Sequence, residues 1–257
     1  MDQSAKTKLT GMEAATAMAY AMYPYTFGIV QDDGHGDEGR DIGTGIGIRW
    51  KKHELILTAA HTVQQTPEDR LYFFLPSDEL VLAPTLSDAD PNRVQFRKRV
   101  LLAEPKILLG DDDLAAVLLP EQKKEISERH FYELDDEHSS PNVGESTAVM
   151  GFPAARLRPL GENYAATPHH DCGSVAQLPA DENPSLRIAV TYSSSEDVDP
   201  AGLSGSGIWR AMPIGKIWAP RLRLAGLVSH YDNDSKLLLG YKVEVLASFL
   251  DDQGELT

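Results

Sequence analysis

Short β-rich runs between turn-forming residues constrain the fold of this chain more than any other feature. Twelve such runs follow one another, each bounded by Gly, Pro, Asp or Asn. They form two groups of six, at 25–31, 43–50, 54–59, 71–75, 94–102 and 114–119, and then at 146–152, 173–178, 185–192, 207–210, 222–230 and 237–243. Strand runs of this length and spacing are typical of β-barrels and sandwiches, not of βαβ units.

A highly charged connector, residues 121–146, separates the two groups of strands. It contains Pro141 and Gly144 and has no sustained alternation of polar and apolar residues. We therefore expect a helical extension over residues 1–24, a first β-barrel over 25–135 and a second over 136–257. Apolar residues at helical spacing near 245–250 predict a short C-terminal helix.

The N-terminal residues carry a helix signal and leave one alternative open. Thr10 and Glu13 have the spacing of a capping box, which favours an amphipathic helix before Pro24. Two lysines ahead of the small apolar run 14–22 also fit a signal peptide, although Glu13 and the lack of leucine in that run disfavour it.

The charge balance and the cysteine count narrow the class of protein. A formal net charge of −15 repels phosphate backbones and anionic lipids, so we expect no nucleic-acid and no membrane partner. No apolar run reaches the length of about 18 residues that a membrane-spanning helix needs. Cys172 is the only cysteine, which excludes an intrachain disulfide and favours a cytoplasmic location over a secreted or periplasmic one.

Two stretches offer metal-binding side chains without the geometry of a metal site. The acidic stretch 32–41 does not fit a calcium-binding loop, so it is interpreted as a solvated hairpin connection. In HHDC, residues 169–172, consecutive side chains of a strand point to opposite faces and cannot close on one ion. We therefore expect no metal ion and no other cofactor.

Three distant stretches together supply the groups that acyl transfer needs. His61 follows the apolar run of ILTAAHTV, Asp113 precedes the apolar run of DDDLAAVLLP, and Ser204 lies in the glycine-rich DPAGLSGSGIW. A serine hydroxyl is a weak nucleophile until an imidazole takes its proton, and a carboxylate orients that imidazole. Each stretch alone also has an ordinary structural explanation, as a strand end, a solvated turn or a tight turn.

The order of these groups along the chain discriminates between folds. An α/β-hydrolase needs an acid and then a histidine after the serine, but no Asp or Glu lies between Ser204 and His230. Ser206 also stands where the G-x-S-x-G motif requires glycine. The order His61, Asp113, Ser204 is that of chymotrypsin-like enzymes, which predicts a cleft between the two barrels.

Three sequence blocks carry a family resemblance. TAAH at 58–61, DLA at 113–115 and GLSGSG at 202–207 resemble the signature blocks of trypsin-like (chymotrypsin-fold) serine proteases. VMGFP at 149–153 and LAGLVSHY at 224–231 extend a similarity that covers roughly residues 25–250. It implies an all-β fold of two six-stranded antiparallel barrels with N-terminal and C-terminal helices.

The resemblance also implies roles for individual residues of a serine endopeptidase acting on proteins or peptides. Ser204 is the expected nucleophile, His61 the general base and then acid, and Asp113 the orienting carboxylate. The backbone amides of Gly202 and Ser204 are expected to form the oxyanion hole. Further residues are expected to line the substrate site, and Asp199 among them favours a basic substrate residue: Val198, Asp199, Ser229, His230, Tyr231 and Gly240.

One departure from the family pattern concerns activation. Leu203 stands where secreted digestive members carry an aspartate that pairs with a newly cut N-terminus, and no activation cleavage sequence precedes the first barrel. Activation by that route is therefore not expected, and restraint by the N-terminal helix or by a regulatory partner is an alternative. Two other functions stay open at this point, a catalytically silent module that binds peptides and an esterase.

Overall fold

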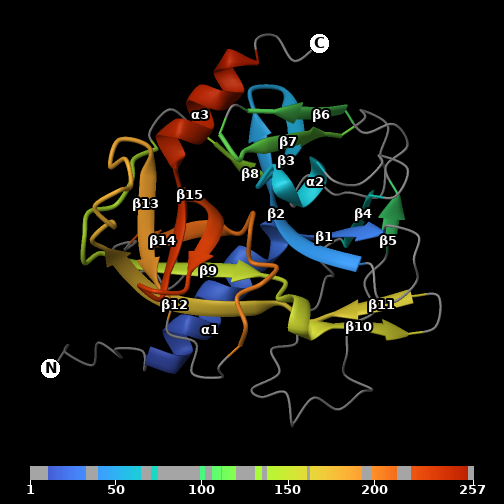
Figure 1. Cartoon of the computed structure of the whole chain (residues 1–257), viewed down its shortest axis with the longest axis horizontal. Helices are drawn as coiled ribbons and strands as arrows, with labels where there is room; N and C mark the ends of the chain where they lie inside the picture. Colours follow the sequence, from blue (N-terminus) through green and yellow to red (C-terminus); the bar gives the residue numbers. More distant parts are fainter. Residues whose placement is uncertain are drawn as a thin grey trace, which may run out of the picture.

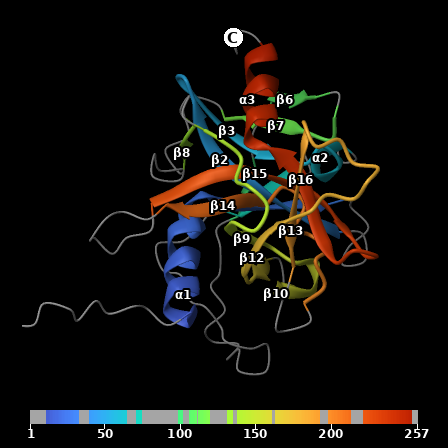
Figure 2. The same ribbon diagram turned by 90° about the vertical axis from the view of Figure 1, so that its left-hand side faces the viewer.

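The computed structural model describes residues 11–32, 40–64, 71–74, 99–101, 106–110, 112–119, 131–134, 138–160, 163–192, 198–212 and 221–253. Within these ranges the chain is mostly β, with helix α1 (Gly11–Met22) before the strands and helix α3 (Val243–Asp252) after them. Both predicted helices are thereby confirmed. The two helices lie at opposite ends of the molecule along the vertical direction of Figures 1 and 2.

The first half of the chain forms an eight-stranded sheet. Its strands are β1 (Thr26–Asp32), β2 (Arg40–Trp50), β3 (His53–Thr58), β4 (Leu71–Phe74), β5 (Arg99–Leu101), β6 (Lys106–Leu109), β7 (Ala115–Leu118) and β8 (Tyr132–Glu133). Seven of them follow the order β5-β4-β1-β2-β3-β7-β6, and β8 pairs with β2 in parallel. Over the described residues this sheet is open at β5 and β6, so closure of a first barrel stays a prediction.

The second half contains the closed six-stranded barrel that was predicted. Its order is β12-β13-β16-β15-β14-β9 around the closure, and each neighbouring pair is antiparallel. The barrel strands are β9 (Ser146–Gly151), β12 (His169–Ala176), β13 (Arg187–Thr191), β14 (Gly207–Met212), β15 (Arg221–Asp232) and β16 (Leu237–Lys242). A separate hairpin of β10 (Leu157–Leu160) and β11 (Asn163–Ala166) lies beside it.

The predicted strand count needs correction in both halves. Four strands were missed: β6, β8, β10 and β11. The acidic stretch predicted to be a hairpin connection lies mostly outside the described residues, but the strands on either side of it pair as β1 and β2 from Asp32 and Arg40 onward. The predicted boundary between the halves is likewise untested and stays a prediction.

One hydrophobic core crosses from the first sheet to the barrel. Ile46 and Leu57 of the first sheet pack in the same cluster as Met150 and Trp209 of the barrel. The indole of Trp209 is fully buried and contacts Tyr25 and Tyr132, whose ring centroids lie 5.7 and 5.1 Å from it. The two halves therefore share packing, and replacing Trp209 by alanine would cost about 3–5 kcal/mol of stability.

The two helices cover different parts of this core. Helix α1 packs on β9, β12 and β15, with Met18, Ala19 and Met22 buried. Helix α3 packs on β15 and β16 and buries Leu246 and Leu250. In the part of the chain described here, neither these helices nor the shorter ones combine the length and the apolarity needed to cross a membrane.

Candidate active site

His61 is held against Asp113 at the first turn after strand β3. Helix α2 (His61–Gln64) begins there, and β3 pairs with β7 so that Thr58 lies opposite Ala115. The His61 ring Nδ1 lies 2.8 Å from Asp113 Oδ2 and 3.0 Å from Oδ1, and the His61 main-chain amide donates to Oδ1 at 2.9 Å. The carboxylate therefore fixes both the ring and the backbone of the histidine.

These contacts also set the protonation of the pair. The hydrogen bond to Asp113 raises the pKa of His61 above its ordinary value, although partial burial opposes this. Burial alone would raise the pKa of Asp113, but the hydrogen bonds from the His61 ring and amide and from the Ala60 amide hold it below its ordinary value. A carboxylate can only accept, so Nδ1 carries the proton and Nε2 is left as the basic nitrogen.

Ser204 lies in a turn that two glycines in the left-handed region make possible. Gly202 has φ +94° and Gly205 has φ +87°. A Cβ atom on Gly205 would lie 1.8 Å from Thr44 O, and one on Gly202 would lie 2.5 Å from Phe152 O. Both the left-handed φ and the nearby main-chain oxygens therefore disfavour any side chain at these two positions. The contact of Gly205 with Thr44 shows that the turn packs closely on strand β2.

The main-chain amides of this turn alternate between bonded and unbonded. Across the described part of the chain, the amides of Gly202 and Ser204 have no hydrogen-bond acceptor. The amides beside them are all bonded: Ala201 to Asp199 Oδ1, Leu203 to Pro200 O, Gly205 to Val228 O and Ser206 to Leu203 O. The two unbonded donors are the two that the sequence predicts for an oxyanion hole, and that role stays a prediction.

Thr44 connects the Ser204 turn to the His61 segment. Its amide donates to Ser204 O at 2.9 Å, and its carbonyl accepts from Thr58 Oγ1 at 2.7 Å, three residues before His61. The Thr44 hydroxyl also donates to Gly202 O at 2.8 Å. Sequence reasoning missed Thr44, because a single threonine in a strand gives no sign of contacts to a loop far along the chain.

Among the hydrogen bonds between described residues, none joins the Ser204 hydroxyl to the His61 ring. Catalytic hydrogen bonds are often long before substrate binds and tighten only in the complex. The structure thus brings His61 and Asp113 into direct contact and joins the Ser204 turn to the same region through Thr44.

The residues predicted to line the substrate site differ in solvent exposure and in the hydrogen bonds that they already make. Val198 is buried and its carbonyl accepts from the Tyr192 hydroxyl at 2.9 Å, whereas Asp199 is exposed and accepts the Ala201 amide at 3.0 Å. His230 is exposed, and the half-buried Tyr231 packs edge-to-face on Tyr192 with centroids 5.7 Å apart. The carboxylate of Asp199 is therefore already engaged in its own turn.

Ser229 and Gly240 are inside the barrel wall. Ser229 is buried, donates to Leu239 O at 3.0 Å and accepts from Arg187 Nη1 at 3.2 Å. A Cβ on Gly240 would lie 2.3 Å from Leu227 O, so this glycine permits the close approach of β15 and β16. Arg187 and Tyr192 were not predicted, because only the strand register brings them to these positions.

The HHDC stretch lies on strand β12, as expected from its sequence. His169 and Asp171 are buried and Cys172 is exposed. Burial and the charges of Arg156 and His170 lower the pKa of His169 to about 3, so its ring is neutral. Within the ranges that the structure describes, no three side chains of the metal-binding types gather at one point.

Comparisons with known proteins give a match in structure but not in sequence. No model of a protein family matches the chain, and no curated protein sequence does.

Three solved structures illustrate the structural similarity, each covering 90% of this chain. An inactivated protease paralogue of the scabies mite has 15% identity over 94% of its length, with a TM-score of 0.57. The granzyme GrC has 16% identity over 94% of its length with a TM-score of 0.58, and human heparin binding protein has 14% over 91% with 0.55. Identities this low establish the fold alone: the chain has the chymotrypsin-like fold that its motifs predict.

Proposed function

We propose that the chain is a serine endopeptidase that hydrolyses peptide bonds through Ser204, His61 and Asp113. The observation that carries this proposal is the double hydrogen bond of Asp113 to the ring and the amide of His61. That arrangement leaves Nε2 basic, which is the requirement for a group that activates a serine hydroxyl. The chymotrypsin-like fold and the unbonded amides of the Ser204 turn support the same function.

In the first half of the proposed reaction, His61 Nε2 takes the proton of Ser204 Oγ while Oγ attacks the carbonyl carbon of the substrate. The carbonyl oxygen becomes an oxyanion, and the amides of Gly202 and Ser204 donate to it. Because no acceptor among the described residues engages these donors, they are available when charge develops. Protonated His61 then gives its proton to the leaving amine, and the acyl group stays on Ser204.

The second half of the reaction repeats these steps with water. His61 takes a proton from the water molecule as its oxygen attacks the acyl carbon, and the same amides hold the new oxyanion. His61 returns the proton to Ser204 Oγ as the ester bond breaks and the carboxylic acid product leaves. Asp113 stays ionised throughout and offsets the positive charge of the protonated ring.

A fluorophosphonate probe tests this proposal directly, because it labels only an activated serine. We expect the wild-type chain to be labelled and the Ser204→Ala variant not to be. Ser206→Ala is the matched control, since Ser206 lies in the same turn but is fully buried. Equal labelling of wild type and Ser204→Ala, or no labelling of a folded wild type, would contradict the proposal. Turnover of a peptide library by the labelled protein then separates a peptidase from an esterase.

A catalytically silent protease-fold module is the second candidate. It is favoured because no hydrogen bond between described residues joins Ser204 to His61, and because one structural neighbour is itself an inactivated protease paralogue. Peptide binding without labelling of Ser204 would identify this function.

We further propose a cytoplasmic location and a control mechanism other than N-terminal cleavage. Leu203, which precedes the nucleophile, is 1% exposed and packs in the barrel core. This position therefore offers an apolar side chain where a carboxylate would have to receive a cut N-terminus. We expect the activity to be the same before and after limited proteolysis of the N-terminal region.

A further inference from the structure

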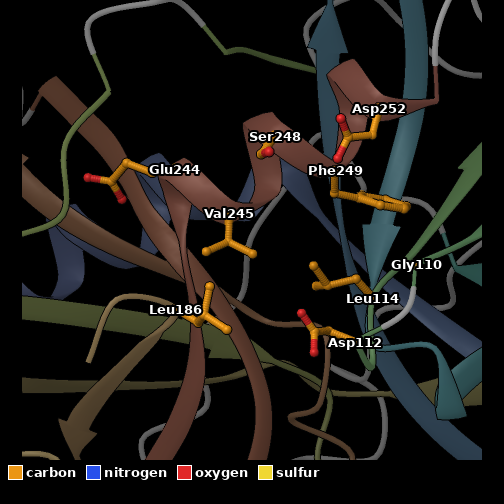
Figure 3. Close-up of a pocket in the computed structure, with 9 residues that line it drawn as sticks. All are labelled: Gly110, Asp112, Leu114, Leu186, Glu244, Val245, Ser248, Phe249 and Asp252. Atoms are coloured by element: carbon orange, nitrogen blue, oxygen red, sulfur yellow. The ribbon is translucent and has the colours of Figure 1, made fainter. Parts of the chain in front are cut away.

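A pocket with a volume of about 340 Å³ lies where helix α3 faces the turn between β6 and β7 (Figure 3). It has an apolar surface formed by Val245 and Phe249 of α3, by Leu114 directly before β7 and by Leu186 directly before β13. Pockets of this size lie at the lower end of the range that takes small organic molecules. The pocket thus has room and apolar area for one small ligand.

Carboxylates flank this apolar surface from two sides. Figure 3 shows Asp112 on the side opposite helix α3, which contributes Glu244 and Asp252. Glu244 is already engaged, because it accepts from the amide of Ser140 at 2.8 Å and also from the Ser140 hydroxyl. Within the described residues, no hydrogen bond or ion pair engages the carboxylate of Asp112 or that of Asp252.

The end of helix α3 adds to the negative potential. Its last turn contains Phe249 and Asp252 and has no basic residue. The carbonyl end of a helix carries partial negative charge, which favours a cation there. Two lysines near helix α3 are engaged outside the pocket. Lys51 Nζ lies 2.8 Å from Asp251 Oδ1, and Asp251 does not line the pocket. Lys242 Nζ donates to Pro184 O at 2.6 Å, and neither residue lines the pocket.

We propose that this pocket binds a small organic cation with an apolar body, such as a protonated arylalkyl amine. The apolar body would lie on Leu186, Val245 and Phe249, and the ammonium group would be attracted by the carboxylates at the edges of the pocket, Asp112 and Asp252. The proposed catalytic residues His61, Asp113 and Ser204 do not line this pocket. The proposal therefore goes beyond the peptidase function and does not depend on it.

The test is a titration of the Ser204→Ala chain with 2-phenylethylamine, followed by calorimetry and by backbone amide NMR shifts. This variant lacks the proposed nucleophile, so binding is measured without turnover. A ligand of this size should bind with a dissociation constant of about 1 mM. We expect the amine to shift the amides around Asp112 and Asp252, and the uncharged 2-phenylethanol to bind several-fold more weakly.

Three variants assign the charge dependence. Asp112→Asn and Asp252→Asn should each weaken amine binding by about two- to fivefold, as expected for partly exposed ion pairs. Asp251→Asn is the matched control, since it removes the same charge from the same helix outside the pocket, and its affinity should stay unchanged. Thermal denaturation of each variant shows that the fold is kept.

The opposite results overturn the proposal. They are equal affinity for amine and alcohol, shifts that map to the Ser204 turn instead of the pocket, or equal weakening by Asp251→Asn and Asp252→Asn. Binding of a peptide lysine without binding of the free amine would also overturn it.

Discussion

Gly205→Ala and Gly144→Ala form a matched pair that tests how the Ser204 turn is held. Both glycines adopt the left-handed region, with φ +87° and +88°. A Cβ on Gly144 would meet nothing within 4 Å, whereas one on Gly205 would lie 1.8 Å from Thr44 O and 2.4 Å from Thr58 Oγ1. The two substitutions therefore share a left-handed φ and differ in the steric contacts of the new Cβ.

The expected magnitudes follow from this difference. An alanine in the left-handed region costs about 1–2 kcal/mol, which is the whole effect expected at Gly144. At Gly205 the new Cβ must move from 1.8 Å to the 3.4 Å of an ordinary contact with Thr44 O, a separation that breaks nearby hydrogen bonds. The bonds at risk are Thr44 N to Ser204 O, Thr58 Oγ1 to Thr44 O and Gly205 N to Val228 O, each worth about 1 kcal/mol. We expect a total loss of about 4–5 kcal/mol.

Urea unfolding and fluorophosphonate labelling together measure the outcome. Gly144→Ala should keep the wild-type labelling rate. Gly205→Ala should unfold at a clearly lower urea concentration and label at least about 100-fold more slowly, because a shift of about 1 Å in catalytic geometry has that effect. Equal stability losses in the two variants, or unchanged labelling of Gly205→Ala, would refute the reasoning that Thr44 and Thr58 position the turn.

Two further predictions concern the same site. His61 must be neutral to act as a base, and Asp113 raises its pKa. As the pH is lowered, activity should therefore begin to fall at a pH higher than the ordinary histidine pKa of about 6.5. In Asp113→Asn the acid limb of the kcat/KM profile should move to lower pH while kcat falls by about 10⁴-fold, and an unmoved limb would contradict this assignment. Thr44→Val should cost about 2–4 kcal/mol of unfolding free energy, because it leaves Gly202 O and a buried main-chain amide without their partner. A loss below about 0.5 kcal/mol in urea unfolding would show that the hydroxyl is dispensable.

Sequence reasoning predicted those strands whose apolar runs are long and clearly bounded. Each of the six strands of the closed barrel overlaps a predicted run, although β12 begins at His169, four residues before the predicted run 173–178. The hairpin of β10 and β11 was missed because Pro159 and Gly161 in its sequence are typical of loops. Strand β6 was missed because its four residues, Lys106–Leu109, run directly into an acidic turn.

The candidate site was predictable to the extent that local motifs define it. TAAH and DLA predicted the segments that meet as His61 and Asp113, and the glycines around Ser204 predicted a tight turn with φ above zero. The hydrogen bond from Thr44 to Ser204 was not predictable from the sequence. It depends on how strand β2 packs against a turn that lies 160 residues later in the chain. Contacts of this kind are set by tertiary packing and leave no periodic signal.

The position of helix α1 has a consequence for how the protein is made. This helix leaves the ribosome before the strands on which it packs, because β9, β12 and β15 follow it by more than a hundred residues. Until those strands are synthesised, the side of the helix that carries Met18 and Met22 lacks these packing partners. Apolar surface exposed in this way favours aggregation of the nascent chain. The packing of this helix is therefore expected to form late and slowly, since it requires contacts of high sequence separation.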